Sequence, residues 1–251
     1  MSGHSHWAGI KHKKALVDAK RGKLWSRLAK AIIVAAKAGG GDPDANLRLR
    51  YAIDDAKAVS MPKDNIQRAI KRGTGELDGG NLEEVAYEGY GSGGVAILCE
   101  VLTDNRNRTA GEIRKIFELS DGKLGGAGCV AWMFHSKGLF LIPLAAIDED
   151  RLMELALETG AEDVQPVGDK FEVTCDPARY HDVGKALAEA GITPEASQIT
   201  RIAKNTIDIN EPEAAQKVLK LMERLDDHDD VQNVSANFNI PQEVLKAIGE
   251  A

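Results

Sequence analysis

The sequence predicts a multidomain α+β protein with an N-terminal basic domain of three helices, a discontinuous α/β domain, and a ferredoxin-like βαββαβ domain inserted into it. Three observations support this prediction. Residues 1–75 have a helical pattern and contain 16 of the 32 Lys and Arg residues but only 6 of the 39 Asp and Glu residues, a formal +10 against −17 for the remainder. A glycine-rich stretch over residues 74–81 follows. Strand-like runs then alternate with helical ones, in the order βαββαβ over residues 138–203.

The first helix is expected over residues 13–38. Leu24, Leu28 and Ile32 recur there at a spacing of four, which places them on one apolar stripe. The glycines at 39–41 are expected to end the helix, since glycine supplies the C-terminal stop.

Two further helices complete the basic domain. Asp42 and Pro43 are expected to begin the second, because Asp caps helices and Pro suits a first turn. The third is expected over residues 63–72, with Gly73 as its stop. The side chains expected to face inward are Leu49, Ala52, Ile53 and Ala56 on the second helix and Ile66, Ala69 and Ile70 on the third.

The α/β domain is expected to begin after the linker at 74–81, which is also the expected hinge. Residues 95–102 are nearly all apolar, as in a strand covered on both faces. A polar turn at 103–108, a helix at 109–119 and an apolar strand at 130–134 are expected next.

The inserted domain has the clearest order of elements. Residues 171–175 alternate between apolar and polar, so one face of its sheet is expected to be solvated. The elements are expected at residues 138–143, 148–158, 163–167, 170–175, 178–190 and 197–203.

Residues 82–134 alone provide too few elements for a closed core. A strand at 206–209, a helix at 212–225 and a strand at 231–238 would complete it. The predicted domains are therefore residues 1–79, residues 80–134 plus 206–251, and residues 135–205.

No catalytic motif is recognisable in the chain. The glycines at 89–94 and 122–128 do not lie between a strand and a helix, as a phosphate-binding loop would, so we interpret both as turns. Asp226, Asp227, Asp229 and Asp230 surround His228, and we favour a solvated loop over a metal site there. We expect no enzymatic activity, no cofactor and no small-molecule substrate.

The N-terminus offers a second metal hypothesis. If the initiator Met is removed, Ser2, Gly3 and His4 could present a planar set of nitrogens to Cu(II) or Ni(II). We favour the simpler interpretation, a polar tail, and so expect no metal.

The basic segment is the best candidate for function. An excess of Lys and Arg on one helical domain is typical of phosphate binding. The residues expected to contact nucleic acid are Lys11, Lys13, Lys14, Lys20, Arg21, Lys23, Lys63, Arg68, Lys71, Arg72, Arg106 and Arg108.

Arg106 and Arg108 admit two interpretations. In a turn before a helix, their guanidinium groups and the free N–H groups of the helix start would suit phosphate. Alternatively, Asn105 and Asn107 shape the turn while the arginines pair with the acidic body. The sequence does not separate the two.

The apolar runs and the cysteines indicate the cellular compartment in which the protein is expected. No apolar run approaches the roughly 20 residues of a membrane span, and the polar start lacks the apolar region of a secretory signal. Cys99, Cys129 and Cys175 lie far apart in strand-like runs, where they are expected to be small buried side chains rather than a disulfide or zinc site. We expect a cytoplasmic protein with no membrane partner.

Several stretches resemble the YebC/PmpR family. They are Gly3–Trp7 with Ile10–Lys14, Met61–Ile66 with Arg68–Lys71, Tyr87–Gly91, Leu102–Thr109 and Asn233–Phe238. Two positions depart from the family pattern: His6 stands where Lys is usual, which removes a charge, and Cys129 stands where Ser is expected.

The resemblance implies three domains, the third inserted in the second, and a cytoplasmic, non-enzymatic protein. Bacterial members are described as DNA-binding transcriptional regulators. Mitochondrial relatives act as translational activators, and some bacterial members are implicated in relieving ribosome stalling at proline-rich stretches.

Three hypotheses follow. The first is a DNA-binding transcriptional regulatory protein that acts through its basic helical domain. The second is a translation factor that contacts ribosomal RNA or the ribosome; it is favoured by the lack of an obvious recognition helix, for which Asn65, Gln67 and Arg68 are the nearest candidates. The third is a protein-interaction scaffold whose basic domain pairs with an acidic partner or with its own acidic body.

Overall fold

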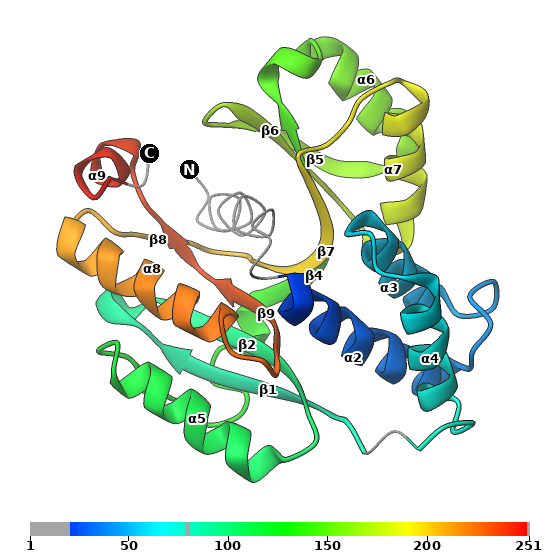
Figure 1. Cartoon of the computed structure of the whole chain (residues 1–251). Coiled ribbons are helices and arrows are strands. Elements are labelled where there is room, and N and C mark those ends of the chain that lie inside the picture. Colours follow the sequence, from blue (N-terminus) through cyan, green and yellow to red (C-terminus); the bar gives the residue numbers. More distant parts are fainter. Residues whose placement is uncertain (1–20, 79–80, 250–251) are drawn as a thin grey trace.

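A computed structural model describes residues 21–78 and 81–249 and confirms the multidomain α+β fold (Figure 1). Its first part, which we call the head, is a helical bundle around a core that includes Ile32, Leu49 and Ile66. The helices are α2 (Arg21–Gly39), α3 (Leu47–Ala58) and α4 (Lys63–Gly73). The side chains predicted to face inward on α3 are all buried, as are Ile66 and Ala69 on α4.

The predicted start of the second helix is wrong. α3 begins at Leu47, and its cap is Asn46, whose side-chain oxygen accepts from the N–H of Leu49 at 3.1 Å. The side-chain amide of Asn46 donates to the carbonyl of Ala35 at 2.8 Å. Asn46 therefore joins α2 to α3, whereas Asp42 only closes a turn by accepting from the N–H of Asp44.

The residues from 81 onward, which we call the body, contain two four-stranded sheets. The first has the order β3-β1-β2-β9, and α5 and α8 pack against it. Its central strand β2 is buried on both faces, as predicted, because Ile97 faces the helices while Leu98 packs on Val130 and Phe134. The elements are β1 (Glu83–Tyr90), η2 (Ser92–Gly94), β2 (Ala96–Thr103), α5 (Arg106–Glu118), β3 (Lys123–Leu124), α8 (Pro212–Asp226) and β9 (Val231–Ala236).

The second sheet has the antiparallel order β5-β6-β4-β7, which confirms the ferredoxin-like pattern. Phe171 and Val173 of β6 point into the core beneath its helices. The elements are β4 (Phe134–Pro143), η4 (Leu144–Ala146), α6 (Glu149–Thr159), β5 (Ala161–Val167), β6 (Lys170–Cys175), η5 (Pro177–Arg179), α7 (Tyr180–Glu189) and β7 (Ala196–Ala203).

The opposite face of this sheet is less solvated than predicted. Glu172 and Thr174 are half-buried and line a cavity of about 660 Å³. Burial, together with the nearby Asp163, raises the pKa of Glu172 to about 7.

The end of the chain returns to the first sheet. β8 (Ile207–Asp208) pairs in parallel with β10 (Phe238–Asn239), and α9 (Gln242–Ala247) follows. Because β9 pairs with β2 across the inserted elements, we retain the boundaries at residues 80–134 plus 206–251 and 135–205 as a proposal. The proposed hinge at 74–81 includes residues 79 and 80, which lie outside the described residues.

The strand predicted at 130–134 is wrong. The chain there forms the short helix η3 (Ala131–Met133), and β4 begins only at Phe134. The cause is the buried carboxylate of Glu88, which accepts from the N–H groups of Gly128, Val130 and Ala131 at 2.6–2.7 Å. Burial alone would raise the pKa of Glu88, but these donors outweigh it and the pKa is lowered.

The cysteines and the helix lengths bear on the predictions about disulfides and membrane spans. Cys99 and Cys175 are buried, as predicted, and Cys129 is half-buried. Within residues 21–78 and 81–249, no helix has both the length and the apolarity needed to cross a membrane.

Glu88→Ala should lower the free energy of unfolding by about 2–3 kcal/mol, because it leaves three backbone N–H groups without an acceptor. Glu84→Ala on the same strand is the matched control. Its side chain is 52% exposed and pairs only with Arg48, so its loss should cost less than about 1 kcal/mol. Urea unfolding followed by circular dichroism measures both, and equal losses would contradict the role given to Glu88.

Candidate nucleic-acid interface

The cations of α2 lie against an acidic segment of the body. Lys23 pairs with Asp229 at 3.3 Å, Arg27 with Asp226 at 3.1 Å and Lys30 with Asp230 at 2.6 Å. We call residues 226–230, between α8 and β9, the acidic loop. The three cations follow a spacing of four and three, so they share one face of α2, and that face is occupied by the acidic loop.

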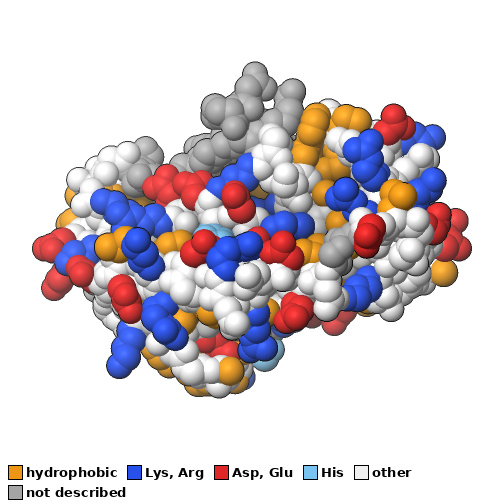
Figure 2. All heavy atoms as spheres, turned by 60° about the horizontal axis from the view of Figure 1, so that its bottom comes forward, with side chains coloured by type: hydrophobic (Ala, Val, Ile, Leu, Met, Phe, Trp, Pro, Cys, Tyr) orange, Lys and Arg blue, Asp and Glu red, His pale blue; other side chains and the backbone are white. Residues whose placement is uncertain are grey.

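The pairs of Arg27 and Lys30 are more shielded from solvent than the pair of Lys23. The side chains of Arg27 and Asp226 are 11% and 20% exposed, and Arg27 also donates to the backbone carbonyl of Asp226. Asp229, in contrast, is 84% exposed, so its pair with Lys23 contributes little. On the face shown in Figure 2, basic and acidic side chains are interspersed, and no field of a single sign covers it.

Asp230 is the centre of this contact. It is 4% exposed, and its carboxylate accepts from Lys30 at 2.6 Å, Thr109 at 2.7 Å and Arg108 at 2.9 Å. Burial opposes ionisation, but these donors outweigh it and hold the pKa of Asp230 well below its usual range. The prediction that the whole run 226–230 is a solvated loop is therefore wrong for Asp230.

Arg106 and Arg108 lie in the first turn of α5 and not in a turn before it, which corrects the predicted helix start. Asn105 caps the helix by accepting from the N–H of Arg108 at 3.1 Å. The guanidinium of Arg108 donates to Asp104 and Asp230, so Arg108 makes the pairing with the acidic body that the second interpretation describes. Arg106 has no ion pair with a described residue, and its backbone carbonyl accepts from the hydroxyl of Tyr87.

α4 differs from α2. Lys63, Arg68, Lys71 and Arg72 are exposed, and none of them forms an ion pair with a residue in the described part of the chain. A groove of about 260 Å³ runs between α2 and α4, lined by Arg68, Arg72, Asn65 and Trp25 among others. α4 therefore offers four cations that can meet an external anion.

The remaining predicted contacts fall outside this description. Lys11, Lys13, Lys14 and Lys20, and the polar start with Ser2, Gly3 and His4, lie outside the described residues. The backbone of Arg21 begins α2, but its side chain also lies outside them.

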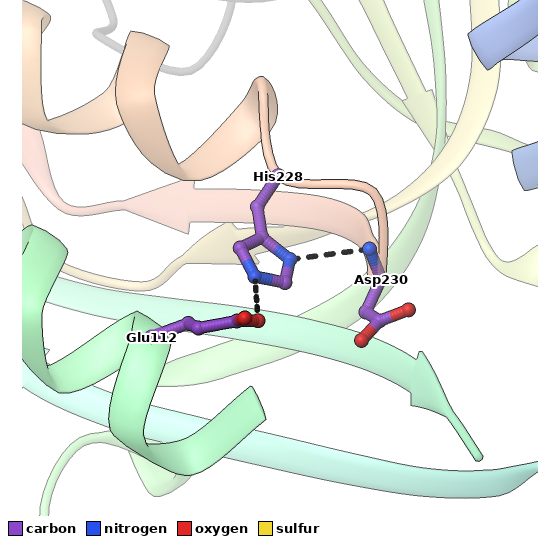
Figure 3. Close-up of side chains that lie close together, drawn as sticks. All are labelled: Glu112, His228 and Asp230. Atoms are coloured by element: carbon purple, nitrogen blue, oxygen red, sulfur yellow. Dashed lines mark hydrogen bonds and ion pairs between the residues drawn. The ribbon is translucent and has the colours of Figure 1, made fainter. Parts of the chain in front are cut away.

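His228 and Asp230 of the acidic loop lie close to Glu112 of α5, and all three are residues of kinds that can bind a metal ion. Ligand atoms of Glu112, His228 and Asp230 lie within 4.8 Å of one another (Figure 3). His228 Nδ1 accepts from the N–H of Asp230 at 3.1 Å, and Nε2 lies 2.9 Å from Glu112. Because Nδ1 accepts, the hydrogen-bond network assigns the ring proton to Nε2, which donates to Glu112. Both ring nitrogens are thus used, and the cluster fits a support for the acidic loop better than a cation site.

These features define a class: an α+β protein whose helical head is held against its body by ion pairs of α2, and whose α4 carries exposed cations with no ion pair within residues 21–78 and 81–249. Residues 5–76 match the TACO1/YebC N-terminal domain, and residues 82–238 match the TACO1/YebC second and third domain. The chain belongs to the TACO1/YebC family.

Similar proteins cover the whole chain. A probable transcriptional regulatory protein of Rhodopirellula baltica is 59% identical over 97% of this chain and 98% of its own length. One from Dictyoglomus turgidum is 55% identical over 99% and 100%. The crystal structure of a conserved hypothetical protein of Aquifex aeolicus superposes with a TM-score of 0.85 at 50% identity, covering 96% of this chain and 99% of that one.

Asp230→Asn should lower the free energy of unfolding at neutral pH by about 3 kcal/mol, because Lys30 and Arg108 lose a buried counter-charge. Since the folded pKa of Asp230 lies below its ordinary value of 3.8, its stabilisation is complete above pH 3.8 and is lost as the pH falls through the folded value. The difference between wild type and variant should therefore shrink in strong acid.

Urea unfolding across a pH series measures this difference. Asp229→Asn, at the exposed end of the same loop, is the matched control and should cost less than about 1 kcal/mol. A pH-independent effect of Asp230→Asn would show that its carboxylate is not the stabilising charge.

Proposed function

We propose that the protein is a nucleic-acid-binding regulator of gene expression, acting in the cytoplasm without catalysis, cofactor or small-molecule substrate. The observation that carries the proposal is the difference between the two helices of the head. Lys23, Arg27 and Lys30 of α2 are paired with the acidic loop, whereas the four exposed cations of α4 have no described partner. Exposed cations grouped on one short helix suit phosphate oxygens.

DNA-linked transcription regulation is the first form of this proposal. Relatives that match this chain over nearly its whole length are named probable transcriptional regulatory proteins. α4 carries Asn65, Gln67 and Arg68, which are side chains of the kinds that contact base edges.

A translation factor that contacts ribosomal RNA or the ribosome, and relieves stalled translation, is the second form. A specific observation favours it: the head is held against a body, residues 81–251, of formal charge −15, and such a body repels a long duplex. Folded RNA, which presents short backbone segments and loops, meets a small basic face more easily than extended DNA does.

The scaffold hypothesis, in the form in which the head pairs with the protein's own body, explains only part of the head. Pairing with the protein's own acidic body accounts for α2 and for Arg108. It does not account for the cations of α4.

Replacing Arg68 and Arg72 together by Ala should weaken nucleic-acid binding and reduce the slope of log affinity against log salt by about 2, because two phosphate contacts are lost. Arg48 and Lys57 of α3 form exposed pairs with Glu84 and Asp54. Their double replacement by Ala removes the same charge from another helix and is the matched control. Fluorescence anisotropy over a salt series measures both; equal effects would mean that only net charge matters.

The face of α2 contributes to binding only if phosphate displaces the acidic loop. Replacing Asp226 and Asp229 by Asn should then tighten binding several-fold, because competing anions are removed. The same titration measures this, with the double variant Asp182→Asn and Glu189→Gln, exposed partners of Arg179 and Lys185 on α7, as the control for net charge. An unchanged affinity would exclude Lys23 from the interface.

Crosslinking in cells followed by sequencing of the bound nucleic acid separates the two forms of the proposal. Enrichment of promoter DNA supports the first, and enrichment of ribosomal RNA supports the second. Recovery of neither, from a protein that crosslinks to other proteins, would favour the scaffold.

A further inference from the structure

Two exposed aromatic side chains meet at one backbone carbonyl, at a distance in sequence from every basic residue considered above. Tyr90, at the end of β1, and Trp132, in η3, both donate to the carbonyl of Cys129, each at 3.2 Å. Trp132 is 71% exposed and Tyr90 39%. Side chains of this size are mostly buried in a folded protein, and nothing in the fold requires these two to remain outside.

The backbone beneath the pair is held firmly. Glu88 fixes Gly128, Val130 and Ala131 through three short hydrogen bonds, and these residues flank Cys129 and Trp132. A Cβ on Gly125 would lie 2.5 Å from the sulfur of Cys129, so this turn is also closely packed. With both polar tips bonded to a fixed carbonyl, the two rings lose little freedom when a ligand covers them.

Two lysines lie on backbone segments next to the pair. Lys123 is the register partner of Tyr90 in the sheet, and the N–H of Lys204 donates to the carbonyl of Met133, next to Trp132. Both lysines are exposed, and neither forms an ion pair with a residue in the described ranges. The nearby carboxylate of Glu88 is buried and accepts from three backbone N–H groups, so it forms no ion pair with either lysine.

We propose that Tyr90 and Trp132 form a stacking platform for an unpaired nucleobase, with Lys123 and Lys204 supplying positive charge for the neighbouring phosphates. Every base has a π-face, so such a platform accepts single-stranded nucleic acid of varied sequence and rejects a duplex, whose bases are already stacked. This inference rests on the proposed function in requiring a nucleic-acid partner. It adds a second contact, on the body, to the one on α4.

Fluorescence anisotropy with the full-length protein tests the platform. The probes are a short labelled single-stranded RNA and a duplex of the same sequence. Trp132→Ala should weaken single-strand binding by roughly tenfold, the effect expected for one stacked base, and leave duplex binding unchanged. Trp132→Phe keeps a π-face and should retain most of the affinity.

Two controls accompany these variants. Leu157→Ala removes another exposed apolar side chain, 78% exposed on α6, and should change neither affinity. Thermal unfolding of each variant should match that of wild type, because Trp132 lies at the surface.

The outcomes separate this inference from the proposed function. If the Arg68 and Arg72 double variant weakens binding while Trp132→Ala does not, the platform is excluded and the proposed function stands. If wild type binds neither probe, the platform is overturned, and the crosslinking experiment above decides the proposed function. Binding of a proline-rich peptide that Trp132→Ala abolishes, with RNA binding unaffected, would overturn the platform and assign the aromatic pair to a protein partner.

Discussion

The arrangement of the head on the body depends on the buried carboxylate of Asp230. A charge taken out of water is costly unless it is fully paired, and Asp230 obtains its partners from both parts of the chain. Lys30 reaches it from the head, and Arg108 and Thr109 reach it from α5. His228 supports the same loop by accepting from the N–H of Asp230 and contacting Glu112. The face of α2 that a charge count marks as basic is therefore the face that holds the molecule together.

Most of the fold could be predicted because the buried face of a helix or strand shows in the local spacing of apolar residues. The inward side chains of α3 and the order of strands in the second sheet follow from spacings of three, four and two residues. The errors fall where a distant group decides the local structure. Asn46 caps α3 because its amide also bonds Ala35, and residues 130–134 leave the strand conformation because Glu88 binds their N–H groups.

The candidate site was predicted less well than the fold for a related reason. Sequence shows how many cations a segment has, but it does not show which of them are paired. Lys30 and Asp230 are 200 residues apart in the chain and 2.6 Å apart in space. Lys63 and Lys30 look equivalent in the sequence, yet one is exposed on α4 and the other faces a buried acid. The aromatic pair was missed because Tyr90 and Trp132 belong to segments that are far apart in the sequence and come together in the fold, where both bond the carbonyl of Cys129.

The burial of the ion pair between Lys30 and Asp230 affects how the head can meet a partner. Salt screens exposed charges strongly and buried ones weakly, so the contact between Lys30 and Asp230 should persist at ionic strengths that weaken binding to α4. A head that swings free on its linker would have to break this buried pair at a cost of a few kcal/mol. Contact with a docked head requires no such step. In the proposed function, the nucleic acid would therefore meet α4 while the head stays on the body, and only short backbone segments would avoid the acidic surface beside it.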